Sequence, residues 1–96
     1  MLRRVVITGL GAVSPNGIGL KTFWENTCKG ISGIDRITSF DPSALSCQIA
    51  GEVTQFEPSV YFSKSDLKKL PRSVPLAVSA TQEALAHAGI DLADFS

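Results

Sequence analysis

The sequence is short of the side chains that most enzymes use for chemistry. Its 96 residues include two cysteines, one tryptophan, one tyrosine and a single histidine, His87. Cys28 and Cys47 stand far apart and form no CxxC pair. This set is too small and too scattered for a structural zinc site. We therefore predict no metal site and interpret the two cysteines as buried, reduced thiols.

An excess of charge of one sign and long apolar runs are also missing. Nine basic and nine acidic residues give a formal net charge of zero, so global electrostatics offers no case for binding nucleic acid. No apolar run approaches the roughly 18 residues that a membrane helix needs. Arg3 and Arg4 precede an apolar stretch that is too short for a signal peptide. These features predict a cytoplasmic protein that does not act at a membrane.

Complete catalytic motifs are lacking as well. The sequence has no Gly-x-Ser-x-Gly, His-Glu-x-x-His or Walker motif. Gly9-x-Gly11 opens like a dinucleotide fingerprint, but Ser14 stands in place of the third glycine and Pro15 interrupts the phosphate-binding helix. We interpret these glycines as a tight turn that ends a strand, and we predict no cofactor. A nucleotide-binding βαβ unit is the weaker alternative. His87 is interpreted as a surface residue near a helix end.

The patterns that are present indicate an α/β protein. Val5–Ile7 form a continuous apolar run inside an expected strand over residues 3–9, and such strands are covered on both faces in parallel sheets. Amphipathic spacing predicts a helix over residues 19–29, with Gly30 as a left-handed cap and Cys28 on the core face.

A long loop is expected next, over residues 30–46, held down by apolar side chains. These are Ile31, Ile34, Ile37 and Phe40. Alternation over residues 47–54 then predicts a half-exposed edge strand.

Two further helices are expected in the second half of the chain. A short helix spans Ser65–Leu70, begins with Ser or Asp and ends at Pro71. A longer helix runs from Val74 to about Ala88, capped by Ser73 and ended by Gly89. A stripe of mostly small residues on this helix predicts close packing against a large partner. The stripe consists of Ala77, Ala80, Thr81, Ala84, Leu85 and Ala88.

These elements do not complete a sheet. One strand buried on both faces, one edge strand and two substantial helices leave backbone groups at the strand edges unpaired. We therefore interpret residues 1–96 as one truncated N-terminal part of a larger α/β protein.

A basic cluster stands out against the neutral composition. It consists of Lys64, Lys68, Lys69 and Arg72. Lys64 and Lys68 are four residues apart and share a helix face, and only Asp66 interrupts the cluster. The cluster is either a solvated face or a docking surface for an acidic partner.

Several separated motifs occur in a characteristic order. They are Arg3–Gly11 followed by Ser14-Pro15-x-Gly17, then Phe23-Trp24, Gly30-x-Ser32-Gly33-Ile34, Phe40-Asp41 and Ala50-Gly51. Together they resemble the elongating β-ketoacyl-acyl carrier protein synthases, the condensing enzymes of fatty acid synthesis. The resemblance implies a thiolase-like fold, in which two duplicated halves build an α/β/α/β/α layered body. Residues 1–96 would be an incomplete part of the first half, with Val5–Ile7 in its first strand.

The resemblance also implies an activity. Family members are acyltransferases that carry out a decarboxylative Claisen condensation of an acyl thioester with malonyl carrier protein, using a cysteine nucleophile and two histidines. Cys28, Cys47 and His87 match none of those positions, so no catalytic residue is assigned. We expect the 96-residue chain alone to be inactive. Full-length family members usually form homodimers.

For the basic cluster, the resemblance implies a partner. Lys68 and Lys69 match a segment of the family that contacts the acidic helix of acyl carrier protein, and Lys64 can substitute for a cation where Ser65 stands. With Arg72, these residues form the expected docking set.

One departure leaves a second reading open. Leu70-Pro71-Arg72-Ser73 stands where many relatives have Met-Asp-x-Phe. This departure leaves the subtype and chain-length preference open. The alternative is a non-catalytic partner like a chain-length factor, or a carrier-protein docking module.

Overall fold

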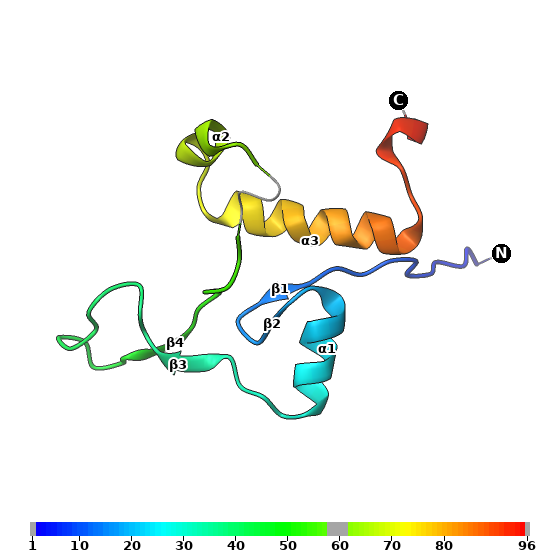
Figure 1. Cartoon of the computed structure of the whole chain (residues 1–96). Coiled ribbons are helices and arrows are strands. Elements are labelled where there is room, and N and C mark those ends of the chain that lie inside the picture. The colour runs from blue at the N-terminus through cyan, green and yellow to red at the C-terminus, as the bar shows by residue number, and fades with distance from the viewer. Residues whose placement is uncertain (1, 58–61, 96) are drawn as a thin grey trace.

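The chain forms an elongated body built around one long helix. The computed structural model describes residues 2–57 and 62–95. Its extents are 56 × 37 × 24 Å and its radius of gyration is 16.9 Å, against about 13 Å for a compact domain of this length. Figure 1 shows the N-terminal segment running beside the helix α3 (Ser73–Ala88), with the short helix α2 (Lys64–Lys69) near the start of α3. The expanded shape leaves much apolar surface in contact with solvent.

Two small antiparallel strand pairs and a helix precede α2. The strand β1 (Val13–Ser14) pairs with β2 (Gly17–Ile18), and the helix α1 (Leu20–Cys28) follows directly. The strand β3 (Ile34–Arg36) pairs with β4 (Ile49–Gly51), and this hairpin extends away from α3 (Figure 1). A 3-10 turn, η2 (Leu92–Phe95), closes the described chain. The mixed α/β composition agrees with the sequence-based expectation.

The N-terminal segment approaches the backbone of α3 very closely. A Cβ atom on Gly9 would lie 2.2 Å from the carbonyl oxygen of Ala84, and one on Gly11 would lie 2.0 Å from that of Ala80. Both distances are far shorter than any real contact, so only glycine fits at these two positions. Close packing of the helix is therefore found at Ala80, Ala84 and Ala88, which are partly buried. The partner is an extended segment and not the large partner predicted, and Ala77 and Thr81 of the predicted stripe are exposed.

The expected role of the two glycines was wrong. The chain reverses direction later, at the β1–β2 turn that contains Pro15 and Asn16. Gly9 and Gly11 lie in extended chain before this turn, where they allow backbone contact with a helix.

The strand predicted over residues 3–9 is not formed. Within the described ranges 2–57 and 62–95, no strand pairs with these residues. Val5 is 91% exposed and Ile7 is 81% exposed, so neither face of the apolar run is covered. A strand requires a neighbour that satisfies its backbone groups, and here only the Gly9–Gly11 end of the segment lies against another element.

The helix predictions agree well with the structure. α1 lies inside the predicted range, and Gly30 and Gly89 adopt the left-handed conformation with φ of 71° and 72°. α2 begins at Lys64, one residue before the predicted Ser65, and is capped by Ser63, whose Oγ accepts a hydrogen bond from the N–H of Asp66 at 3.2 Å. The predicted Ser73 cap is wrong, because Ser73 is already the first residue of α3 and the helix has no side-chain cap.

Other local predictions require correction. The loop expected over residues 30–46 contains β3, and the edge strand expected over 47–54 is confined to β4. Ile31, Ile34 and Phe40 were expected to hold the loop down, but all three are exposed. Cys28 and Cys47 are both exposed, not buried, because little of the chain packs against them. In the part of the chain that the structure describes, no helix is long and apolar enough to cross a bilayer.

Candidate functional site

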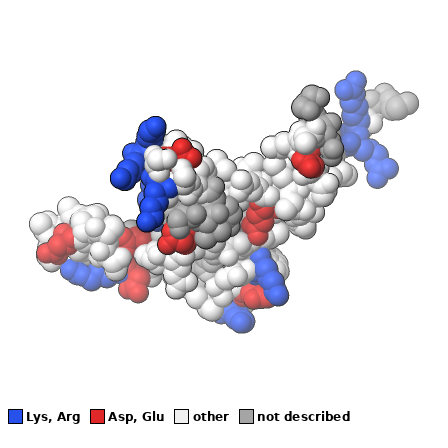
Figure 2. Space-filling view, turned by 45° about the horizontal axis from the view of Figure 1, so that its top comes forward, with Lys and Arg blue, Asp and Glu red and all other residues white. Residues whose placement is uncertain are grey.

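The basic surface is the strongest candidate site, and we define it as Lys64, Lys68 and Lys69 of α2 together with Arg72. All four residues are exposed. Figure 2 shows Lys and Arg side chains gathered on the side of the molecule that carries α2, with an acidic group close by. Lys68 and Lys69 lie in the last turn of α2, where a cation interacts favourably with the helix dipole. Asp66, in the first turn, benefits from the opposite end of that dipole.

The opposite side of α2 is held by apolar contacts. Leu67 and Leu70 are partly buried, and they line a cavity of 190 Å³ together with Phe56, Pro75 and Arg72. Phe56 is only 8% exposed, the one apolar side chain in the described chain buried to this degree apart from proline. Because the two leucines face this cavity, the lysines of α2 face solvent.

The four cations of the basic surface differ in their bonding. The Nη2 of Arg72 donates a hydrogen bond to the carbonyl oxygen of Val53 at 2.6 Å. In the described part of the chain, Lys64, Lys68 and Lys69 make no hydrogen bond or ion pair through their ammonium groups. The three lysines are therefore available to a partner, while Arg72 already has an acceptor.

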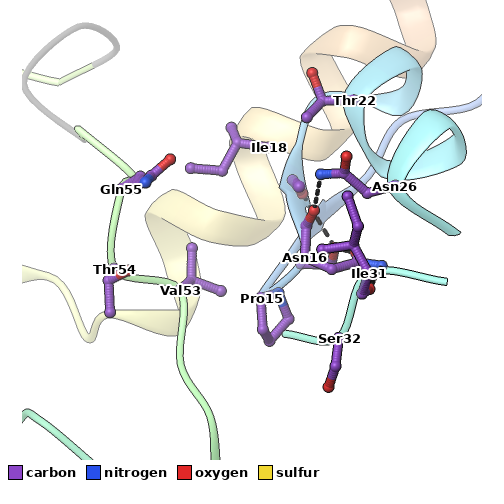
Figure 3. Close-up of a pocket in the computed structure, with 12 residues that line it drawn as sticks. Pro15, Asn16, Ile18, Thr22, Asn26, Ile31, Ser32, Val53, Thr54 and Gln55 are labelled. Carbon is purple, nitrogen blue, oxygen red and sulfur yellow. Dashed lines mark hydrogen bonds between the residues drawn. The ribbon is translucent and has the colours of Figure 1, made fainter. Parts of the chain in front are cut away.

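A second candidate is a polar cavity of about 470 Å³ beside the β1–β2 turn (Figure 3). The side chains of Ser14, Asn16 and Asn26 are bonded within the turn and its surroundings. Asn26 donates to the carbonyl of Asn16, and Ser14 Oγ donates to Asn16 Oδ1 at 2.7 Å. The residues that line it are uncharged. This arrangement supports the turn and offers no group positioned for catalysis.

The residues with catalytic side-chain types are dispersed. His87 is exposed, as predicted, and its Nδ1 accepts a hydrogen bond from the N–H of Leu10 at 3.0 Å. Cys28 lies at the end of α1, and Cys47 lies before β4. Among the described residues, no group of three or more His, Cys, Asp or Glu side chains is placed to hold a metal ion.

Sequence reasoning missed the role of Glu83. Its Oε1 accepts the N–H of Ala12 at 2.9 Å, and its Oε2 accepts the N–H of Leu20 at 2.8 Å. One signal was present, because Glu83 follows Ala80 by three residues and so lies near the small-residue stripe. The partners themselves are backbone groups more than sixty residues away, and no local pattern identifies them.

The β3–β4 hairpin carries one strongly perturbed carboxyl group. The N–H of Thr38 donates to Glu52 at 2.8 Å and that of Ser39 donates at 3.1 Å. These bonds, led by the one from the backbone of Thr38, lower the pKa of Glu52 from 4.5 to about 2. The carboxylate thereby closes the loop that follows β3.

The sequence is similar to those of known proteins. Residues 2–96 match the family of the β-ketoacyl synthase N-terminal domain. A 3-oxoacyl-[acyl-carrier-protein] synthase 2 of Staphylococcus aureus is 41% identical over 92 residues, which are 96% of this chain and 22% of the relative. The protein of the same name from Synechocystis sp. is 39% identical over 83 residues, covering 86% of this chain and 20% of the relative.

Solved structures agree with the sequence comparison. The ishigamide ketosynthase/chain length factor superposes with a TM-score of 0.83 at 35% identity, covering 96% of this chain and 23% of the other. The chain thus spans about a fifth of the length of these relatives, and its fold is that of the N-terminal portion of a thiolase-like ketosynthase. This 96-residue chain belongs to the β-ketoacyl synthase family.

Proposed function

We propose that this chain is the N-terminal part of a 3-oxoacyl-[acyl-carrier-protein] synthase and that the basic surface docks acyl carrier protein. The family match and the names of the relatives support the first part. The single observation that supports the second is the presentation of Lys64, Lys68 and Lys69, which extend to solvent from a helix whose other side is fixed.

The physical basis of docking is electrostatic. Concentrated positive charge on a neutral chain steers an acidic partner toward one face and fixes its orientation on contact. Such an interaction is screened by salt over a distance of about 10 Å at 0.1 M. Docking therefore depends on ionic strength more strongly than an apolar interface does.

Condensation itself requires groups that this segment does not bring together. The reaction transfers an acyl group from a thioester to the carbanion left when a malonyl thioester loses carbon dioxide, and the acyl carrier's thiol is released. Cys28, Cys47 and His87 lie on separate elements and form no nucleophile–base pair. We therefore propose that residues 1–96 contribute scaffold and docking without catalysing condensation. Malonyl-dependent release of carbon dioxide by the purified chain contradicts this assignment.

Charge reversal tests the docking surface. The affinity of acyl carrier protein is measured at low salt for this chain and for the variant Lys68→Glu with Lys69→Glu. We expect the variant to bind several-fold more weakly or worse. The matched control is Lys21→Glu with Lys29→Glu, which makes the same change of charge at exposed positions on and just after α1. Equal affinity of all three proteins removes the docking surface and leaves the family assignment unchanged.

A second candidate function is that of a non-catalytic partner like a chain-length factor. The structural match to a ketosynthase/chain length factor favours keeping it. The two functions differ in whether a nucleophilic cysteine is supplied outside residues 1–96. Labelling of the longer protein with a thiol-directed acyl analogue separates them, because the enzyme is acylated at an active-site cysteine and the partner is not. The homodimer and the cytoplasmic location stay predictions.

A further inference from the structure

Arg72 lies in the link between α2 and α3, whereas the three lysines lie on α2 itself. α2 ends at Lys69 and α3 begins at Ser73, so the link between the two helices is three residues long. Arg72 is the last residue of this link and the N-cap of α3. Its guanidinium reaches across to the carbonyl oxygen of Val53, 19 residues earlier in the chain, at 2.6 Å.

That bond ties the link to the β3–β4 hairpin. Val53 directly follows Glu52, whose carboxylate is bonded to the backbone of Thr38 and Ser39. The acceptor of the Arg72 bond therefore belongs to a segment that is itself held in place. A guanidinium donor on a carbonyl acceptor is a charge-assisted bond, which is shorter and stronger than a neutral one.

α2 needs such anchoring because it is very short. It has six residues, whereas isolated helices below about 12–15 residues are marginal in water. Within the described chain, α2 is anchored by apolar contacts with Phe56 and Pro75 and by the neighbouring Arg72–Val53 bond. Arg72 lines the same cavity as Phe56 and Pro75, so the apolar contacts and the Arg72–Val53 bond together set the direction in which the helix points.

We propose that Arg72 is a positioning residue of the docking surface and does not contact the carrier protein. By holding the α2–α3 link to Val53, it keeps Lys64, Lys68 and Lys69 facing the acidic partner as one group. The expected four-cation docking set is thereby divided into three contact residues and one anchor. This inference rests on the proposed docking function.

Two variants at one position test the inference. Arg72→Met removes the donor and keeps an unbranched apolar stem, while Arg72→Lys restores a positive donor. Amide hydrogen exchange over residues 64–69 is measured in the complete chain without any partner. We expect exchange in α2 to be at least several-fold faster in Arg72→Met and to return toward the original rate in Arg72→Lys. Unchanged exchange in Arg72→Met overturns the proposal.

The second readout is the salt dependence of acyl carrier protein binding. Lys68→Met removes a contact charge, so it is expected to weaken binding and to flatten the plot of log affinity against log salt. Arg72→Met is expected to weaken binding at least threefold while leaving that slope unchanged. A flattened slope for Arg72→Met, or an unchanged affinity, contradicts the positioning role.

The outcomes also distinguish this inference from the proposed function. If Lys68→Met and the charge reversal leave affinity unchanged, the docking function itself is wrong and the positioning role in docking falls with it. If those lysine variants weaken binding while Arg72→Met does not change exchange in α2, docking stands and only the role of Arg72 is wrong.

Discussion

The carboxylate of Glu83, in the middle of α3, accepts the backbone N–H of Leu20, the first residue of α1, across 63 residues of sequence. Gly19 precedes α1 and has no side chain to cap it. The first N–H groups of a helix have no partner inside that helix, and a negative charge near them is favourable. Glu83 therefore caps α1 from another helix, and its second oxygen holds Ala12.

Removing this carboxylate should loosen the N-terminal part of the fold. Glu83→Ala leaves the N–H groups of Ala12 and Leu20 without their acceptor, and such a loss costs about 1–3 kcal/mol. We expect faster amide exchange in α1 and a lower free energy of unfolding in denaturant. Gln82→Ala, one residue away and exposed, is the matched control. Equal effects of the two substitutions contradict the capping role.

The close approach of the N-terminal segment to α3 leads to a prediction at Gly11. In Gly11→Ala, the new methyl group would lie 2.0 Å from the carbonyl of Ala80, so the segment must move away from the helix. Overpacking of this kind costs about 1–3 kcal/mol. Gly30→Ala is the comparison, because its methyl group meets open space and only the left-handed backbone is strained. Nuclear Overhauser contacts between residues 9–11 and Ala84 should be lost in Gly11→Ala and retained in Gly30→Ala.

The pKa of Glu52 predicts acid sensitivity of the β3–β4 hairpin. Folding lowers this pKa from 4.5 to about 2, so the carboxylate contributes stability that is complete above pH 4.5 and lost as pH falls toward 2. The amide signals of Thr38 and Ser39 should shift across this range, and their exchange should quicken. In Glu52→Gln this pH dependence should disappear, whereas Glu25→Gln on α1 should leave it intact. A Thr38 signal that titrates identically in Glu52→Gln would disprove the assignment.

The uncovered apolar run predicts self-association of the isolated chain. Val5, Val6 and Ile7 are all exposed, and their backbone has no strand partner among the described residues. Unpaired apolar edges of this kind template pairing between chains. We expect concentration-dependent light scattering and binding of a hydrophobic dye, both reduced by Val5→Lys. Thr8→Lys adds the same charge beside the run and serves as the control. A chain that stays monomeric and dye-free contradicts the prediction.

Local signals in the sequence were sufficient for the helices. The apolar spacing of α1, the proline at position 71 that ends α2, and the glycines after α1 and α3 each act within a few residues, so their outcome is readable from the chain. The strand expected over residues 3–9 can form only if other elements pair with it and cover its faces. Its apolar pattern shows that such neighbours are required, but it does not show whether they are present.

The candidate site also contains residues that a local pattern predicts and residues whose partners lie far away in the sequence. An exposed lysine cluster on α2, whose docking role stays a prediction, was predicted from the sequence because a charged cluster at helical spacing is a local pattern. The different roles of Arg72 and Glu83 were not, because each acts on a backbone group of a distant segment. Which carbonyl or N–H a side chain reaches is decided by tertiary packing alone.

The distance along the chain between the N-terminal segment and α3 has a consequence for biosynthesis. Leu10 and Ala12 are bonded to residues 77 and 71 positions later. At about 5–20 residues per second, a ribosome needs on the order of ten seconds to deliver those partners. Until α3 has been synthesised, Leu10 and Ala12 lack these partners, and the exposed apolar side chains of Val5, Val6 and Ile7 next to them are open to other contacts.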